Sequence, residues 1–233
     1  METEDIKTEN NTNNTENTEP KKGGHKVLNI IGILLGVVLV ILGILQITGG
    51  SNTGKLSNDF INKMKEIDSL SSEIATELQE ANNLFLNIEE KDKTKDYSGI
   101  VKDLEESQVK FDNTVAKIKT LDATVAEFKT MVESQSDPKI KESGLKLIGV
   151  LEQRNAAILK LTNDIKKLVD PTKKYYEDLA AGKQPSYLSD AEINTIIQEI
   201  NKDSQTLNTL MSQFEEASRE FGDAAGLNQN NTK

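Results

Sequence analysis

Four segments after residue 55 repeat apolar residues every seven positions, and this pattern constrains the fold more than any other feature of the chain. A seven-residue repeat places the apolar side chains on one face of a helix, and that face must pack against other helices. The alternation of apolar and polar residues that is typical of a strand is missing from these segments. The repeating positions are Phe60, Ile67, Ile74, Ala81 and Ile88; Tyr97, Leu104, Phe111, Ile118, Val125 and Val132; Leu151, Ile158 and Ile165; and Ile193, Ile200, Leu207, Phe214 and Phe221.

Turn and capping signals separate the four segments. They are the charged turn at 91–95, the N-cap and proline Asp137-Pro138, the stop signals Gly182 and Pro185, and the capping box at 189–192. Asp170-Pro171 repeats the N-cap signal inside the third segment, so we expect a kink or a restart of the helix there.

Short turns between long helices make neighbouring helices antiparallel. We therefore predict an all-α fold, in which residues 55–222 form a long up-down four-helix bundle of the coiled-coil type and residues 223–233 form a disordered tail. Residues 138–183 carry ten basic and six acidic side chains, whereas residues 186–233 carry three and eight. The third and fourth helices are therefore predicted to be electrostatically complementary neighbours.

Residues 27–48 form a second strong signal, because this stretch of Ile, Leu, Val and Gly has no charged residue. As a helix its 22 residues would extend roughly 33 Å, enough to cross a bilayer core of about 30 Å. We predict a single transmembrane helix here. Residues 1–26, rich in Asn, Thr and Glu, are predicted to be a disordered tail, and residues 49–54 a flexible linker.

The apolar run is longer than the core of a cleaved signal peptide and lacks an Ala-x-Ala site, which favours an uncleaved anchor, although Thr48 to Ser51 are small enough for cleavage. Lys21, Lys22 and Lys26 lie closer to the span than the first lysines after it. By the positive-inside rule we expect the N-terminus in the cytoplasm and the C-terminal domain outside it.

Small and polar residues follow one stripe of the predicted membrane helix. Gly32 and Gly36 form a GxxxG motif, and Gly43 and Asn29 share their face, with Gln46 beside it. Small residues allow two membrane helices to approach closely, so this stripe is a candidate dimer face. The alternative is that the glycines are ordinary for a membrane helix and the polar residues mark its ends.

The four tyrosines are predicted to gather at the end of the bundle that lies far from the anchor. Tyr97 follows the first turn, and Tyr175, Tyr176 and Tyr187 flank the last one. Tyrosine suits recognition surfaces because its ring is apolar and its tip is polar, so this end is a candidate partner-binding tip. The alternative is that the rings close the open end of the core.

Polar residues interrupt the predicted core at several positions, where they would line an internal ligand cavity, set helix register or drift to the surface. They are Ser71, Gln108, Asp122, Asn155, Thr162, Ser204 and Ser218.

Catalytic and metal-binding signatures are missing from the sequence. It contains no cysteine, its one histidine is His25, and it has no Walker or GxGxxG sequence, so we predict no enzyme activity and no cofactor or metal. The net charge of −10 argues against a nucleic-acid partner.

The favoured interpretation is a scaffold or adaptor at the bacterial cell envelope, with the bilayer and a protein or second copy as partners. The alternative is an extracytoplasmic sensory or ligand-binding module that acts through a partner membrane protein. A third possibility keeps the fold but places it in the cytoplasm as a tether.

Overall fold

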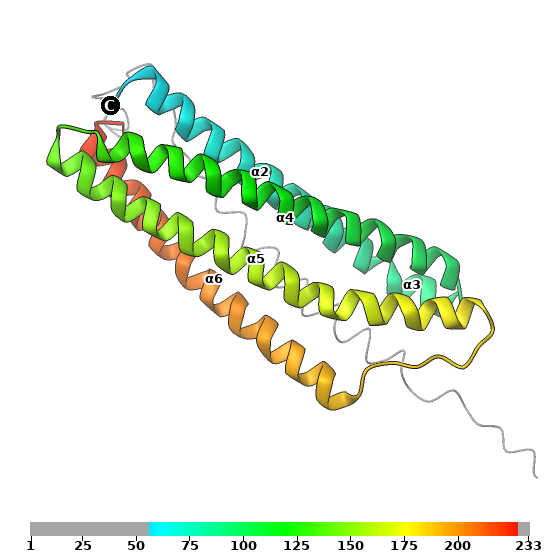
Figure 1. Cartoon of the computed structure of the whole chain (residues 1–233). Helices are drawn as coiled ribbons and strands as arrows, with labels where there is room; N and C mark the ends of the chain where they lie inside the picture. The colour runs from blue at the N-terminus through cyan, green and yellow to red at the C-terminus, as the bar shows by residue number, and fades with distance from the viewer. Residues whose placement is uncertain (1–55, 228–233) are drawn as a thin grey trace, which may run out of the picture.

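The computed structural model describes residues 56–227, and within this part of the chain all regular structure is helical (Figure 1). The prediction of an all-α fold is therefore confirmed. The helices are α2 (Asn58–Leu86), α3 (Ile88–Lys93), α4 (Tyr97–Glu133), α5 (Pro138–Ala180) and α6 (Asp190–Ala225).

Short-range capping bonds begin α5 and α6 where the sequence indicated. The Asp137 side chain accepts a bond from the amide of Lys139, with Pro138 in the first turn. Ser189 and Glu192 form a reciprocal capping box at the start of α6. These bonds satisfy amide groups that have no partner inside the helix, so the local sequence is enough to locate the ends.

The first predicted helix divides in two, since α2 ends at Leu86 and the short helix α3 starts at Ile88 and includes much of the charged turn. Lys95 then takes a positive φ of 58°, and Asp96 caps α4. At the other end of the chain α6 continues to Ala225, where Gly226 with φ of 75° ends it, three residues beyond the predicted boundary at 222.

Of the kink or restart expected at Asp170-Pro171, the restart is wrong, because α5 runs without interruption from Pro138 to Ala180. A proline inside a helix removes one backbone donor, here the amide that would bond the carbonyl of Lys167, and costs about 3 kcal/mol. Leu168 and Val169 before it and Thr172 after it are all buried. Packing on both sides of Pro171 therefore holds the helix together across the missing bond.

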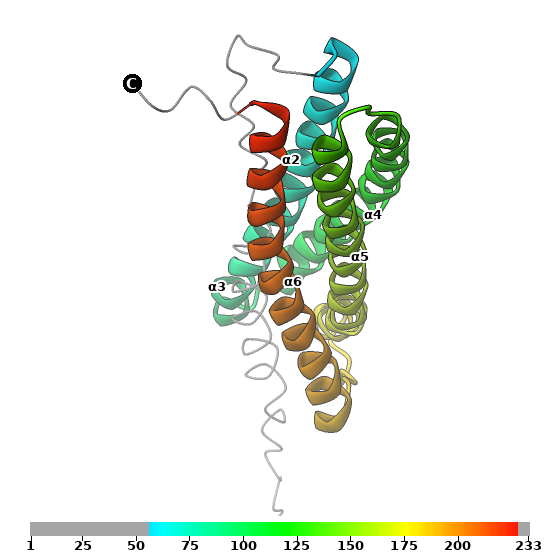
Figure 2. The ribbon, with the colours of Figure 1, turned by 90° about the vertical axis from the view of Figure 1, so that its left-hand side faces the viewer.

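The helices pack in chain order, α2 on α4, α4 on α5 and α5 on α6, and they alternate in direction (Figures 1 and 2). The predicted heptad residues from Phe60 to Phe221 fill the space between them, with Tyr97 only partly buried at one end. Within residues 56–227, α2 and α6 are not closely packed along their length. Their aromatic rings still meet at one end, where the Phe60 and Phe221 centroids are 5.9 Å apart.

The two ends of the bundle differ in the residues that fill them. Leu56, Phe60, Phe128 and Phe221 pack at what we call the proximal end, where the described chain begins. Gly144 allows α5 to approach α4 closely here, since a Cβ atom at this position would lie 2.7 Å from Val132 Cγ1. The opposite, distal end carries α3 and the turn from α5 to α6.

The predicted membrane helix at 27–48 lies outside the described residues, as do the tail at 1–26, the linker at 49–54 and the stripe of Asn29, Gly32, Gly36 and Gly43. Among the helices of residues 56–227, none combines the length and the apolar character needed to cross a bilayer.

Candidate functional site

The distal end brings the four tyrosines into one continuous ring cluster. The ring centroids of Tyr97 and Tyr176 are 6.1 Å apart, those of Tyr175 and Tyr176 are 5.2 Å apart, and those of Tyr175 and Tyr187 are 5.5 Å apart. The contacts join the start of α4, the end of α5 and the connection to α6. Because the helices alternate in direction, Tyr97 and Tyr187 belong to one cluster although 90 positions separate them in the sequence.

The four rings differ in exposure, and this difference limits what each can do. Tyr176 is completely buried and Tyr175 is 9% exposed, whereas Tyr97 and Tyr187 are half-buried. The Tyr187 hydroxyl lies 2.8 Å from Thr172 Oγ1. Tyr175 and Tyr176 therefore close the end of the core, and only Tyr97 and Tyr187 present ring surface to a partner.

The hydroxyl of Tyr176 is buried near the Asp92 carboxylate, but it forms no hydrogen bond of ordinary geometry with the described residues. Burial, followed by the negative charge of Asp92, raises the pKa of this hydroxyl well above its ordinary value. Tyr176 is therefore a neutral phenol at any physiological pH.

Ion pairs between lysines and carboxylates connect each pair of helices that are consecutive in the packing order. We call these three contacts the ion-paired interfaces. Between α2 and α4 they are Lys63–Glu127, Lys110–Glu80 and Lys117–Glu73; between α4 and α5, Lys129–Glu152, Lys166–Asp112 and Lys173–Glu105; and between α5 and α6, Lys146–Glu220, Lys160–Asp203 and Lys167–Glu199.

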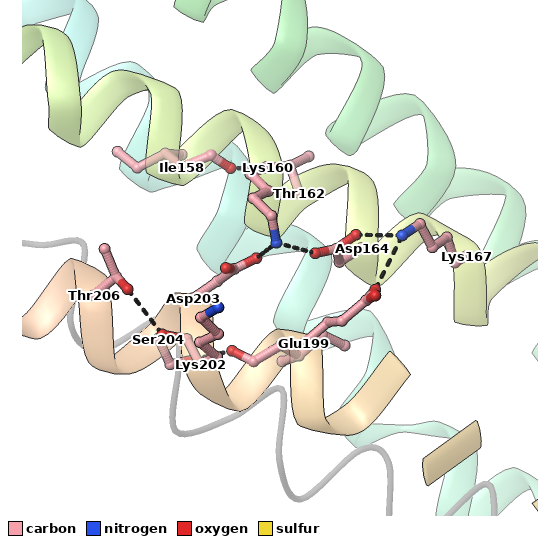
Figure 3. A network of polar contacts seen from close by, with 11 residues as sticks. Ile158, Lys160, Thr162, Asp164, Lys167, Glu199, Lys202, Asp203, Ser204 and Thr206 are labelled. Atoms are coloured by element: carbon pink, nitrogen blue, oxygen red, sulfur yellow. Dashed lines mark hydrogen bonds and ion pairs between the residues drawn. The ribbon is translucent and has the colours of Figure 1, made fainter. Parts of the chain in front are cut away.

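The α5–α6 interface contains a connected network of this kind (Figure 3). Lys160 Nζ lies 3.0 Å from Asp164 and 2.6 Å from Asp203, and Lys167 Nζ lies 2.6 Å from Asp164 and 3.1 Å from Glu199. Both aspartates are buried, whereas both lysines are exposed. The charge complementarity of the third and fourth helices therefore takes the form of buried aspartates bridged by the exposed Lys160 and Lys167.

Burial tends to raise the pKa values of both aspartates, but with the neighbouring charges included the two values shift in opposite directions. Although burial opposes it, bonds from Lys167 and Lys160 hold the pKa of Asp164 below its ordinary value. Burial raises the pKa of Asp203, and the adjacent Asp164 carboxylate adds to that rise. In this network two lysines bridge three carboxylates, those of Asp164, Asp203 and Glu199.

The predicted polar interruptions of the core have different environments. Thr162 and Ser204 are satisfied by carbonyls of their own helices, those of Ile158 and Ile200. The fully buried Asn155 donates to the exposed Asp122 of α4 at 2.8 Å, and Gln108 of α4 donates to Asp170 of α5. Ser218 Oγ is buried and has no hydrogen-bonding partner.

Ser71 accepts a hydrogen bond from a residue that sequence reasoning missed. Arg154 of α5 is 3% exposed, and its Nη2 atom donates to Ser71 Oγ of α2 at 2.9 Å. The guanidinium carbon also lies 4.7 Å from the ring centroid of Phe214 on α6. One signal could have pointed to it, since the chain uses 26 lysines and only two arginines.

The polar groups around Arg154 are incompletely paired. Arg154 Nε and Asp68 Oδ1 are buried and have no hydrogen-bonding partner. Burial lowers the pKa of Arg154 to about 10, against the opposing effect of the Asp68 carboxylate. Burial likewise raises the pKa of Asp68. Arg154 and Asp68 thus attract each other across the core without a direct bond.

Metal chemistry has no obvious place in this part of the molecule. Within residues 56–227 no group of three or more His, Asp or Glu side chains is arranged to hold a metal ion.

The chain matches no protein-family model, and comparisons with curated proteins and with solved structures gave no significant match.

Proposed function

We propose that the chain is a non-enzymatic, single-pass membrane protein of the bacterial cell envelope and that its helical bundle acts as a scaffold or adaptor. In this proposal residues 27–48 are the anchor, the N-terminus is cytoplasmic and the bundle is extracytoplasmic. The bundle would hold its distal end away from the bilayer and present it to a protein partner.

One observation carries the proposal: the bundle is a long rod whose two ends have different surfaces. The described chain starts at the proximal end, only eight residues after Thr48, whereas Tyr97 and Tyr187 lie at the distal end. At about 1.5 Å per residue, the 43 residues of α5 extend about 65 Å. The rod is therefore long enough to hold a binding surface well beyond lipid headgroups.

The sides of the rod support the choice of its tip. Among the described residues, Leu86 and Val109 are the exposed large hydrophobic side chains, and ion pairs cover the α2–α4, α4–α5 and α5–α6 contacts. Exposed lysine and carboxylate side chains contribute little to binding when they are solvated, whereas tyrosine is enriched at binding hot spots.

Photocrosslinking in the native cell tests the tip. A photoreactive group at Ser98 or Ser186, both exposed beside Tyr97 and Tyr187, should capture a specific protein. The same group at the exposed Lys119, midway along α4, should not capture it. Equal capture at all three positions, or none at the tip, would contradict the proposed binding surface.

Protease accessibility tests the membrane orientation. Protease added to cells whose outer layers have been opened should remove the bundle beyond Lys55, because the proposal places it outside the cytoplasm. Digestion only after lysis of the inner membrane would place the bundle inside, as a cytoplasmic tether.

A sensory module is the second candidate, and the incompletely paired polar atoms of Arg154 and Asp68 favour it. A small polar ligand held by them would distinguish sensing from scaffolding. Thermal stabilisation of the purified protein by such a compound, lost in Arg154→Met, would support this candidate.

A further inference from the structure

The contact between α2 and α6, which we call the seam, differs from the other helix contacts of the bundle. None of the lysine–carboxylate pairs named above joins α2 to α6. The bond from Arg154 to Ser71 joins α2 to α5 rather than to α6. α2 and α6 also share few close backbone contacts, in contrast to the three pairs of neighbouring helices α2–α4, α4–α5 and α5–α6.

The charges of α2 and α6 do not attract these two helices to each other. α2 carries two basic and six acidic side chains, and α6 carries two and eight. Each helix turns carboxylates toward a lysine-bearing neighbour, as Glu73 of α2 does toward α4 and Glu199 of α6 toward α5. Both helices of the seam are therefore acidic, and the charge complementarity found between α5 and α6 has no counterpart between α2 and α6.

Helical spacing assigns residues of α2 to the two sides of the helix. Glu66, Glu73 and Glu80 are seven residues apart and lie toward α4, where Glu73 and Glu80 pair with lysines. Asp68, Ala75 and Asn82 form a separate seven-residue series on the side of α2 away from these lysines, and the Asp68 carboxylate is attracted to Arg154 of α5. Asp68 Oδ1 and Asn82 Oδ1 of that series are both buried without a hydrogen-bonding partner.

We infer that the bundle opens along the seam between α2 and α6, and that the buried Arg154 sets how readily it opens. Burying a charge with incomplete hydrogen bonding costs free energy, and opening recovers that cost when water reaches the guanidinium and the Asp68 carboxylate. The three ion-paired interfaces stay closed in the open state. The seam is then a two-state element whose open form exposes the core faces of α2 and α6.

Single cysteines can test this opening because the chain contains none of its own. Ala75→Cys places a thiol in the seam, at a position 2% exposed. Ala217→Cys is its matched control, fully buried and spaced by two heptads from Asp203 on the side of α6 that faces α5. Thiol labelling of the full-length protein in detergent micelles under native conditions measures how often each site opens.

We expect Ala75→Cys to be labelled at least tenfold faster than Ala217→Cys, with a weaker dependence on urea, because seam opening exposes less surface than global unfolding. Equal labelling rates with equal urea dependence would overturn the inference, since both sites would then open only by global unfolding.

A second pair of variants tests the part assigned to Arg154. Arg154→Met replaces the buried charge by an apolar side chain of similar length and should slow labelling of Ala75→Cys about tenfold. Lys146→Met removes an exposed α5–α6 ion pair with Glu220 and should leave that rate unchanged within about twofold. An unchanged or faster rate in Arg154→Met would show that Arg154 does not set the opening. Circular dichroism identifies any variant that fails to fold, and Arg154→Leu then replaces it.

Discussion

At the scale of single residues, the described part of this protein is organised by where it buries polar atoms. Tyr176 and Arg154 are both buried at core positions, and each leaves one polar atom without a partner. Asn155 is buried as deeply and donates to Asp122, but its Oδ1 atom also has no partner, whereas the hydroxyl of the buried Thr162 donates to the carbonyl of Ile158. Burial of a polar side chain is therefore common in this core, and incomplete pairing is confined to a few sites.

The Tyr176 hydroxyl should contribute little to folding. Tyr176→Phe removes a buried group that has no hydrogen bond, so the free energy of unfolding should stay within about 1 kcal/mol of wild type or rise. Tyr176→Ala removes the ring as well and should cost about 3–5 kcal/mol. Urea denaturation of the two variants measures both effects. A large loss in Tyr176→Phe would mean that the hydroxyl bonds to Asp92 in solution.

The raised pKa of Asp68 predicts that the stability contributed by this residue depends on pH. A carboxyl whose pKa is higher in the folded state than in the unfolded state favours folding at low pH, and that contribution is lost as pH rises through the folded-state pKa. Asp68→Asn has no such dependence. The stability of this variant relative to wild type should therefore increase between pH 4 and pH 7, as measured by urea denaturation at both values. A relative decrease would show that attraction to Arg154 outweighs burial.

Sequence reasoning missed the environment of Arg154, because that environment depends on three helices. Arg154 shares a seven-residue series with the buried Leu147, Leu161 and Leu168, but only the meeting of α2, α5 and α6 places Ser71 and Phe214 around it. For the tyrosines, the alternating helix directions alone predict that Tyr97 meets Tyr175, Tyr176 and Tyr187 at one end of the bundle. How deeply each ring is buried still depended on packing at that end.

At the scale of the helices, the ends could be predicted where the signal is local. Asp137, Ser189 and Gly182 act on the nearest few residues, so the sequence around each of them is sufficient. The break at Asn87 and the continuity through Pro171 depend on neighbouring helices. The local sequence therefore predicts a restart at Pro171, whereas α5 is continuous through this residue.

Pro171 should therefore be a site where the natural sequence is less stable than its variant. Pro171→Ala supplies the missing amide to the carbonyl of Lys167 and removes the clash of the ring with the preceding turn. The gain is partly offset because alanine makes the unfolded chain more flexible. We expect a net rise of about 1–2 kcal/mol in the free energy of unfolding, measured by urea denaturation. A loss of stability would indicate that α5 requires the local geometry of proline for its packing.

At the scale of the whole molecule, the described residues include a core that runs from Phe60 to Phe221. Within residues 56–227, the contacts that bury this core come from α2, α4, α5 and α6. The bundle is also long enough to form a continuous core of its own. Folding should then be a property of the bundle, and membrane attachment a separate one.

Residues 55–233 should therefore fold without the preceding segment, giving a strongly helical circular dichroism spectrum and a cooperative thermal transition. Ile200 is completely buried in α6, so Ile200→Asp would place an unpaired charge in the core and should cost about 3–5 kcal/mol. Gln198→Asp, at an exposed position two residues earlier, should change stability by less than about 0.5 kcal/mol. If the excised bundle shows no cooperative transition, folding depends on residues 1–54. If the two aspartate variants melt alike, the buried face of α6 has been assigned to the wrong residues.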